Sequence, residues 1–363
     1  MSDAPRLLLV PVSGPRGMGE YARCLAVAAA VRGRWPRAEP HLLVSREAPY
    51  AASCPFPATL LPSSATRCTR EVLEAFARWR PHVVWFDNAG RTRQVQGAHA
   101  AGAGVVFVSS RSRQRRKAFR LRWMRAIDEH WISYPAALTG GLGPLERLKL
   151  RLLGRPALRF LDAVVAPPDE ADAQRLLGAA AAPDVVVVPG GGSTYPDARI
   201  SPQHFLDWSL ALAAQGRRVI VVGGPSFAAP AAVAERLTFL RGVPGGTLMA
   251  LLLRARLVLV NGGDTLAQAL ALGCACVAVP IAGDQAGRIA RAAALGVLEA
   301  PAPAAVVERC AALLADDAAR AALRARLAAL GWRDATPLIL ERLAALFDAA
   351  AQRAPGRRAI SSS

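Results

Sequence analysis

Apolar runs of strand length alternate with helical patterns along the whole chain. In the first half these runs occupy residues 7–12, 41–45, 83–87, 105–109, 131–133 and 163–166. In the second half they occupy residues 185–189, 218–222, 257–261 and 275–280, and each ends in Gly, Pro or Asn where a helix would begin. This alternation predicts parallel sheets covered by helices.

A chain of 363 residues is too long for one typical core, which predicts two domains. We place the first domain at residues 1–166 and the second at 167–335, with the linker near 165–183. The pattern after about residue 303 is helical. The last helix, 336–351, is a candidate to cross back onto the first domain, and 352–363 reads as a disordered basic tail. Two consecutive doubly wound domains would turn the carboxyl ends of their strands toward a shared central cleft.

Composition and charge narrow the class of protein. With 53% apolar and 20% charged residues the chain is globular, and the absence of a long apolar run or signal-like segment leads us to expect a cytoplasmic protein. The net charge is +18, yet residues 1–165 hold 26 basic and 11 acidic residues, a net charge of +15 for that half. The first half is therefore expected to meet an anionic surface or substrate. The six scattered cysteines form no CxxC pair, so we expect no structural zinc.

The stretch 257–296 carries the strongest candidate site. A buried strand runs into Gly262 and Gly263, and a helix opens near Asp264 or Thr265. Glycines allow the backbone to approach a ligand, and a helix N-terminus offers N–H groups to a pyrophosphate. The alternative role for Asp264 is a helix N-cap.

Polar residues follow in the same stretch. Gln268 lies one helical turn after Thr265 and is a candidate for a ribose hydroxyl. Asp284 and Gln285 come at the next strand-to-helix junction, where an acid and an amide suit sugar hydroxyls. For Asp284, too, the alternative is an N-cap.

Two further glycine-containing loops follow strands of the second half. Gly191, Gly192, Ser193 and Thr194 come after the first of them and could cradle phosphate or sugar, while Gly223 follows the next strand. Neither the P-loop ending Gly-Lys-Ser/Thr nor the GxGxxG fingerprint is present, so a dinucleotide cofactor is disfavoured. We expect no cofactor other than a nucleotide sugar as substrate.

The first half offers two acidic candidates for catalysis. Glu20 would lie in the first turn of the helix that follows the first strand, and it could act as general base or simply favour the helix dipole. Asp87 ends the strand at 83–87, where it could orient substrate, act as base or start a turn.

At these residues the chain resembles the GT-B glycosyltransferases, particularly the C-terminal domain of family 28. The segment NGGDTLAQALALG…VAVP…DQ…ALG is similar to that family's series. The resemblance implies two Rossmann-like domains facing a cleft, an inverting, metal-independent transfer, and diphosphate contacts at Gly262, Gly263 and Thr265. It also implies a ribose contact at Gln268, where the family usually has Glu, and donor-sugar contacts at Asp284 and Gln285; Arg288 stands where the family usually has Asn.

The opening of the first domain is similar to another enzyme. GMGEYARCLAVA resembles the GxGHxxRCLxLA opening of the UDP-sugar hydrolase of pseudaminic acid synthesis, with Glu20 in place of His. No DxD motif is present, so metal-assisted departure of the nucleotide is not implied and we expect no metal site. Helix dipoles and backbone amides would then stabilise the leaving diphosphate.

Residues 111–125 contain eight basic residues and no acid. Aromatic and aliphatic residues recur here at intervals of four: Phe119, Trp123, Ile127 and Trp131. Such a stripe is more typical of a helix facing a sheet than of one on a membrane. For the basic cluster we favour an anionic partner, either an inner-membrane surface or a lipid-linked acceptor. The candidate contacts are Arg16, Arg113, Arg115, Arg116, Lys117 and Arg120.

Three functions are open at this point. The first is transfer of a sugar, from a UDP-sugar by preference, to an envelope, lipid-linked or polysaccharide acceptor. The second is hydrolysis of a nucleotide sugar, and the third is a non-catalytic binding protein of the same fold. A nucleic-acid partner is not expected, because no RNA- or DNA-binding module is recognisable and the glycine loops would be unexplained.

Overall fold

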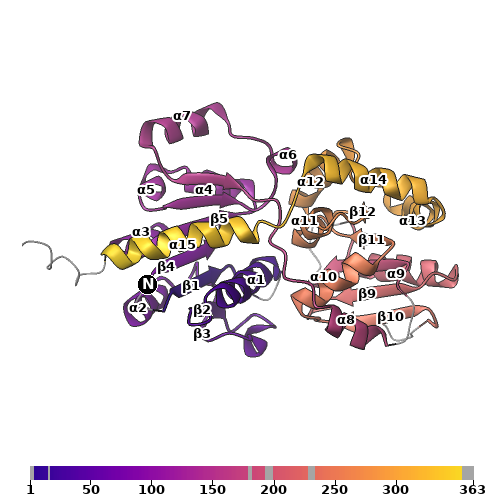
Figure 1. Cartoon of the computed structure of the whole chain (residues 1–363), viewed down its shortest axis with the longest axis horizontal. Coiled ribbons are helices and arrows are strands. Elements are labelled where there is room, and N and C mark those ends of the chain that lie inside the picture. Colours follow the sequence, from indigo (N-terminus) through magenta and orange to yellow (C-terminus); the bar gives the residue numbers. More distant parts are fainter. Residues whose placement is uncertain (1–3, 15–16, 179–181, 193–198, 228–233, 354–363) are drawn as a thin grey trace, which may run out of the picture. The chain divides into compact units, whose positions relative to one another are not determined.

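The chain folds into two compact units, which are described separately (Figure 1). The computed structural model describes residues 4–14, 17–178, 182–192, 199–227 and 234–353. Unit 1 comprises residues 1–133, 141–161 and 335–363, and unit 2 comprises residues 134–140 and 162–334. Among the described helices, none combines the length and the apolar character that crossing a bilayer requires.

Unit 1 is built on a seven-stranded parallel sheet with the order β3-β2-β1-β4-β5-β6-β7. Its strands are β1 (Arg6–Pro11), β2 (Glu39–Ser45), β3 (Ala58–Leu61), β4 (Val83–Asp87), β5 (Gly104–Ser109), β6 (Glu129–Ile132) and β7 (Ala157–Phe160). The central strands β1, β4 and β5 are buried almost throughout, which explains their continuous apolar sequences.

Helices cover both faces of the unit 1 sheet. The helices of unit 1 are α1 (Gly19–Arg34), α2 (Thr69–Trp79), α3 (Thr92–Ala100), α4 (Ser112–Ala118), α5 (Leu121–Met124), α7 (Pro144–Leu153) and α15 (Thr336–Arg353). One face packs on α2, α3 and α5, where Phe86 and Phe107 meet Trp123 and its neighbours. The C-terminal helix α15, yellow in Figure 1, packs on α1, β4 and β5, with Phe347 edge-on to Trp35.

Unit 2 is built on a five-stranded parallel sheet with the order β10-β9-β8-β11-β12. Its strands are β8 (Val185–Gly190), β9 (Val219–Gly223), β10 (Leu237–Arg241), β11 (Leu257–Val260) and β12 (Cys276–Ala278). Alternate residues of β8 face opposite sides, so that Val186 and Val188 join one core while Val185 and Val187 join the other.

Two layers of helices enclose this sheet. The helices of unit 2 are α6 (Ala136–Thr139), α8 (Glu170–Leu177), α9 (Pro202–Ala214), α10 (Gly245–Arg254), α11 (Asp264–Ala271), α12 (Gly283–Ala294), α13 (Val306–Ala315) and α14 (Asp317–Leu330). Helices α10, α11 and α12 pack on one face, and α9 and α13 on the other. Both units are therefore doubly wound α/β domains, as the alternating pattern predicts.

The structure corrects the element assignment at a few positions. The run 163–166 was predicted as a strand but forms only one β-bridge, between Ala163 and Asp334. The backbone N–H of Val165 donates to the side chain of Asp334 instead of to a neighbouring strand. The expected linker contains helix α8. Three strands, β3, β7 and β10, were not predicted, and each lies at the edge of its sheet, where burial is incomplete and the apolar pattern is weak.

Candidate functional site

The strand order of unit 1 reverses between β1 and β4, the point where open α/β sheets bind ligands. Asp87 ends β4 there, and Arg23 of α1 reaches it. The guanidinium Nε and Nη2 donate to the two carboxylate oxygens, each at 2.7 Å. Asp87 is 0% exposed and Arg23 is 4% exposed. A bidentate pair this deeply buried ties α1 to β4.

Glu20 lies in the first turn of α1, beside the same strand ends. Its Oε1 accepts a hydrogen bond from Asn88 Nδ2 at 2.8 Å. Asn88 is itself fixed, because its Nδ2 also donates to Ser110 Oγ at 2.6 Å and its Oδ1 accepts from the Ser110 N–H at 2.8 Å. The left-handed backbone of Asn88, with φ of 51°, turns the chain away from β4. Glu20 is thus a half-buried carboxylate held through one oxygen.

These contacts separate the two acidic candidates. Both oxygens of Asp87 are bound to Arg23 and its side chain is fully buried, so the structure favours a structural role for Asp87 over the predicted role as base. Glu20 is left as the candidate base. The predicted acceptor contact Arg16 lies outside the described residues.

In unit 2 the strand order reverses between β8 and β11. Asn261, the residue after β11, joins the two loops that follow these strands. Its Nδ2 donates to the Pro189 carbonyl at 2.8 Å, and its Oδ1 accepts from the Gly263 N–H at 2.7 Å. The loops after β8 and β11 therefore meet at the predicted ligand-binding edge of the sheet.

Close backbone contacts explain the glycines of this edge. A Cβ at Gly192, where φ is +92°, would lie 2.3 Å from the Phe227 nitrogen. A Cβ at Gly224 would lie 2.4 Å from the Gly191 Cα, so the loops after β8 and β9 also touch. Gly223 is buried against the rings of Phe227 and Phe239 and serves packing. Of the remaining predicted contacts in this loop, Ser193 and Thr194 lie outside the described residues.

The helix α11 begins at the predicted place. Gly263 is its N-cap residue and Asp264 its first residue, so Asp264 is not the N-cap considered above. The Asp264 Oδ1 instead accepts from the Tyr134 hydroxyl at 2.7 Å. Thr265 follows in the first turn and is half-buried.

The start of α12 is tied to the same loop by Gln285. Its Oε1 accepts from the backbone N–H of Ile281 at 2.9 Å and of Gly262 at 3.2 Å, and the residue is buried. The Gln285 amide therefore shapes the glycine loop. The sequence had suggested only a sugar contact for this residue. Asp284 is exposed in the first turn of α12, whose N-cap is Ala282, so an N-cap role is wrong for Asp284 as well.

A buried arginine beside the glycine loop was not predicted as a site residue. Arg288 donates to the Gly262 carbonyl, pairs with Asp284 at 3.5 Å and lies over the Tyr134 ring, 3.8 Å from its centroid. Its Nε is buried without a hydrogen-bond partner among the described residues. The sequence signal for Arg288 was its place where the family usually has Asn. Tyr134 lies far from it in the sequence and gave no signal.

Gln268 has a specific partner. Its Nε2 donates to the Val164 carbonyl at 2.8 Å. A carboxylate at this position could not donate to that carbonyl, which gives a physical reason for Gln where the resembling family has Glu. The Gln268 Oε1 remains the atom that could meet a ribose hydroxyl.

The basic residues divide into two groups. Arg113, Arg116 and Arg120 are exposed on α4 and at the start of α5. Arg115 instead pairs with Glu146 at 2.6 Å, and Lys117 donates to the Gly90 carbonyl at 3.0 Å. Burial, with neighbouring arginines, lowers the pKa of Lys117 to about 8. Phe119, Trp123, Ile127 and Trp131 are all buried. The single helix expected to carry them is wrong, because only Trp123 lies in a helix, α5, and Trp131 lies in β6.

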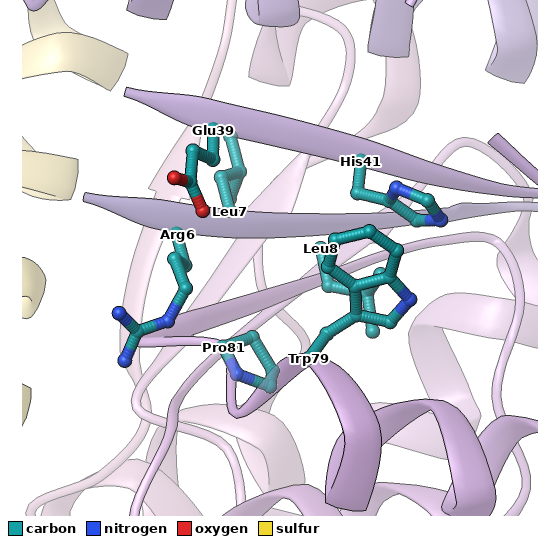
Figure 2. Close-up of a pocket in the computed structure, with 7 residues that line it drawn as sticks. All are labelled: Arg6, Leu7, Leu8, Glu39, His41, Trp79 and Pro81. Atoms are coloured by element: carbon teal, nitrogen blue, oxygen red, sulfur yellow. The ribbon is translucent and has the colours of Figure 1, made fainter. Parts of the chain in front are cut away.

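A small pocket at the opposite edge of unit 1 does not qualify as a ligand site. Figure 2 shows Arg6, Leu8, His41 and Trp79 around it, at the start of β1 and beside β2. Its volume is about 10 Å³, enough for a single water. The His41 ring lies tilted against Trp79 with the ring centroids 3.8 Å apart, and burial lowers the pKa of His41 to about 4. Within the described residues, His, Cys, Asp and Glu side chains form no cluster of three or more that could hold a metal.

Comparison with known proteins identifies the architecture. No protein-family model and no curated protein matches the sequence. Among solved structures, SnogD from Streptomyces nogalater, a glycosyltransferase, is similar with a TM-score of 0.62 and 17% identity, over 95% of this chain and 100% of that one. This chain has the GT-B fold.

Two further structures have the same architecture. Phytolacca americana UGT2 complexed with UDP-2fluoro-glucose and pterostilbene is similar with a TM-score of 0.62 and 14% identity, over 95% of this chain and 100% of that one. Acinetobacter baumannii MurG is similar with a TM-score of 0.57 and 13% identity, over 94% and 99%. The predicted fold class is confirmed, and at these identities the likeness concerns the fold.

Proposed function

We propose that this chain is a glycosyltransferase that takes its sugar from a nucleotide-diphosphate donor, a UDP-sugar by preference. The donor diphosphate binds in unit 2 at the loops after β8 and β11, and Glu20 of unit 1 is the general base. The acceptor belongs to the envelope: a lipid-linked or polysaccharide hydroxyl. This assignment reaches beyond the fold. It rests on the residues at the two switch points, where the strand order reverses between β1 and β4 in unit 1 and between β8 and β11 in unit 2.

One observation carries the donor site: Asn261 joins the two glycine loops at the switch point of unit 2. Glycines at 191, 192 and 262 bring bare backbone to this edge, and the N-terminus of α11 follows directly. Backbone N–H groups and a helix N-terminus favour a diphosphate. The buried guanidinium of Arg288 on the Gly262 carbonyl adds positive charge beside the loop. The fold neighbour from Phytolacca americana is a complex with UDP-2fluoro-glucose, a ligand of the proposed class.

The proposed base is built for proton acceptance. Asn88 engages Glu20 Oε1, which leaves Oε2 without a partner among the described residues. In the proposed step the acceptor hydroxyl gives its proton to Glu20, and its oxygen bonds to the anomeric carbon. The bond from that carbon to the diphosphate breaks with inversion, and the electron pair leaves with the nucleoside diphosphate. Backbone N–H groups stabilise that charge without requiring a metal.

Titration calorimetry with UDP-, GDP-, dTDP- and ADP-sugars tests the donor site, and turnover of the donor that binds tests the chemistry. Glu20→Gln removes the proton acceptor while keeping the hydrogen bond from Asn88 possible through its amide oxygen. We expect kcat to fall by about 10²- to 10⁴-fold with donor affinity unchanged. Glu47→Gln, an exposed glutamate of unit 1 bound to Ser63, is the matched control and should leave kcat unchanged.

The outcomes discriminate the alternatives. Sugar release at full rate without an added acceptor would identify a nucleotide-sugar hydrolase, with water in place of the acceptor hydroxyl. Donor binding with no turnover in the unaltered protein would identify a non-catalytic binding protein. If no nucleotide sugar binds, the carbohydrate function is wrong.

A further inference from the structure

Helix α7 of unit 1 presents a row of leucines to solvent. Leu145, Leu148 and Leu152 are 62%, 51% and 75% exposed, and the ten-residue helix has no buried residue. Spacings of three and four residues place the three side chains on one face. Isolated exposed leucines are ordinary, but a continuous row on one helix is typical of a contact surface.

Two polar side chains of α7 hold this helix on unit 1. Glu146 pairs with Arg115 of α4 at 2.6 Å, and Lys149 Nζ donates to the Phe119 carbonyl at 3.1 Å, in the turn between α4 and α5. These contacts place α7 beside α4 and α5 at the surface of unit 1 (Figure 1). Leu121, at the start of α5, is also 51% exposed. Polar contacts therefore hold α7 on unit 1 while its leucines stay exposed.

Positive charge surrounds this row. Residues 111–155, all of which the structure describes, contain 12 basic and 3 acidic residues, half of the net charge of the whole chain. Each of the three acids, Asp128, Glu129 and Glu146, is in an ion pair. Arg147 and Arg151 are exposed on α7. Arg122 and Arg125, with Gln96 and His99, line a surface groove of about 340 Å³ beside α5.

We propose that α7 is a membrane-docking helix that lies in the interface of an anionic lipid bilayer. Its leucine row enters the boundary of the acyl chains, and the exposed arginines of α7, α4 and α5 bind lipid phosphates. A protein partner would explain the leucines, but the excess of basic over acidic residues in 111–155 matches an anionic lipid surface. Docking on the bilayer needs no nucleotide sugar. A failure of the docking experiment can therefore be told apart from a failure of donor binding.

Vesicle flotation of the full chain tests this proposal. We expect flotation with vesicles of phosphatidylcholine mixed with phosphatidylglycerol, little with phosphatidylcholine alone, and a loss at high salt. Combining Leu145→Ser, Leu148→Ser and Leu152→Ser should lower the partition coefficient by about a hundredfold, because three apolar side chains no longer leave water. Arg147→Gln with Arg151→Gln should lower it by about tenfold or more.

The matched control replaces three exposed leucines of other elements, through Leu60→Ser, Leu176→Ser and Leu253→Ser. These are 44%, 42% and 45% exposed, and their replacement should leave flotation unchanged. Thermal melting of each variant in solution checks that it is folded. Equal flotation of the α7 and control variants overturns the proposal. A second outcome also overturns it: the unaltered chain fails to float, but it self-associates in sedimentation experiments and the α7 leucine variant does not.

Discussion

The two switch points of this protein have the same topology and opposite chemistry. In unit 1 the ends of β1 and β4 carry charged side chains: the buried pair of Arg23 with Asp87, and Glu20 held by Asn88. In unit 2 the ends of β8 and β11 carry glycines and amides, with Asn261 and Gln285 bound to backbone. The first edge is thus built around ionisable side chains, whereas the loops of the second edge are built from glycines and amides, with Arg288 beside them.

This difference shows that the strand order supplies a place and the local residues supply the chemistry. Backbone amides suit a ligand whose negative charge is constant, such as a diphosphate. A carboxylate fixed by an uncharged amide suits proton transfer. The comparison also predicts different responses to mutation, since a buried ion pair fails when one partner is removed, whereas a glycine loop fails when a side chain is added.

The largest effect on stability is expected at the buried pair of unit 1. Asp87→Ala leaves the Arg23 guanidinium buried without its countercharge, so the free energy of unfolding should fall by about 3–5 kcal/mol. Urea denaturation measures this change. Replacing both residues, through Arg23→Met with Asp87→Leu, should cost less than Asp87→Ala, because no charge is then stranded.

An exposed ion pair provides the control for this prediction. Arg70 and Glu74 of α2 are paired at 3.6 Å with most of each side chain in water. Arg70→Ala should change the free energy of unfolding by no more than about 0.5 kcal/mol. If Asp87→Ala costs no more than Arg70→Ala, the ion pair does not hold α1 to β4.

The next effect concerns the glycine loop of unit 2. In Gly192→Ala the new Cβ would meet the Phe227 backbone, so the loop must shift. We expect donor affinity, measured by calorimetry, to fall by about tenfold or more, since the backbone can no longer approach the ligand.

Gly216→Ala separates this effect from backbone strain. Gly216 also has a left-handed backbone, with φ of +81°, but a Cβ there meets no atom within 4 Å. Strain of about 1–2 kcal/mol should lower its stability while donor affinity stays unchanged. An equal loss of affinity in both variants would show that the close contact at Gly192 is irrelevant to binding.

The last effect is absent at neutral pH and concerns acid stability. Burial lowers the pKa of His130 in β6 to about 3, whereas an unfolded histidine titrates near pH 6.5. Between these values the unfolded chain takes up a proton that the folded chain does not. Stability is therefore expected to fall as pH drops through this window, and to be unaffected by this group above it.

His130→Gln tests this prediction in urea denaturation at a series of pH values. The amide can keep the hydrogen bond to Ser109 Oγ, which His130 Nε2 makes at 2.9 Å, but it does not titrate. The decline toward acid should become shallower. His204→Gln, at an exposed histidine of α9, should leave the decline unchanged. An unchanged decline in His130→Gln would mean that other groups control acid stability.

The sequence by itself determined the doubly wound fold and the positions of its glycine loops. Central parallel strands are buried on both faces, so their apolar runs are visible in sequence, as at Val83–Asp87 and Leu257–Val260. The edge strands β3, β7 and β10 are only partly buried, and their mixed composition hid them. The starts of α1 at Gly19 and of α11 at Asp264 followed from the glycine-containing loops after two predicted strands.

Only the tertiary structure decided which side chains meet. Arg23 and Asp87 stand 64 positions apart, and Gln268 reaches a carbonyl 104 positions away, so no local pattern records these contacts. Exposure was decided in the same way. Residues 119, 123, 127 and 131 have the spacing of one apolar helix face, as do the leucines of α7. The first set is buried although only Trp123 lies in a helix, whereas the leucines do share one helix and face water. A spacing of four residues is therefore compatible with a helix face without requiring one, and only the packing of the other elements decides whether an apolar face is covered.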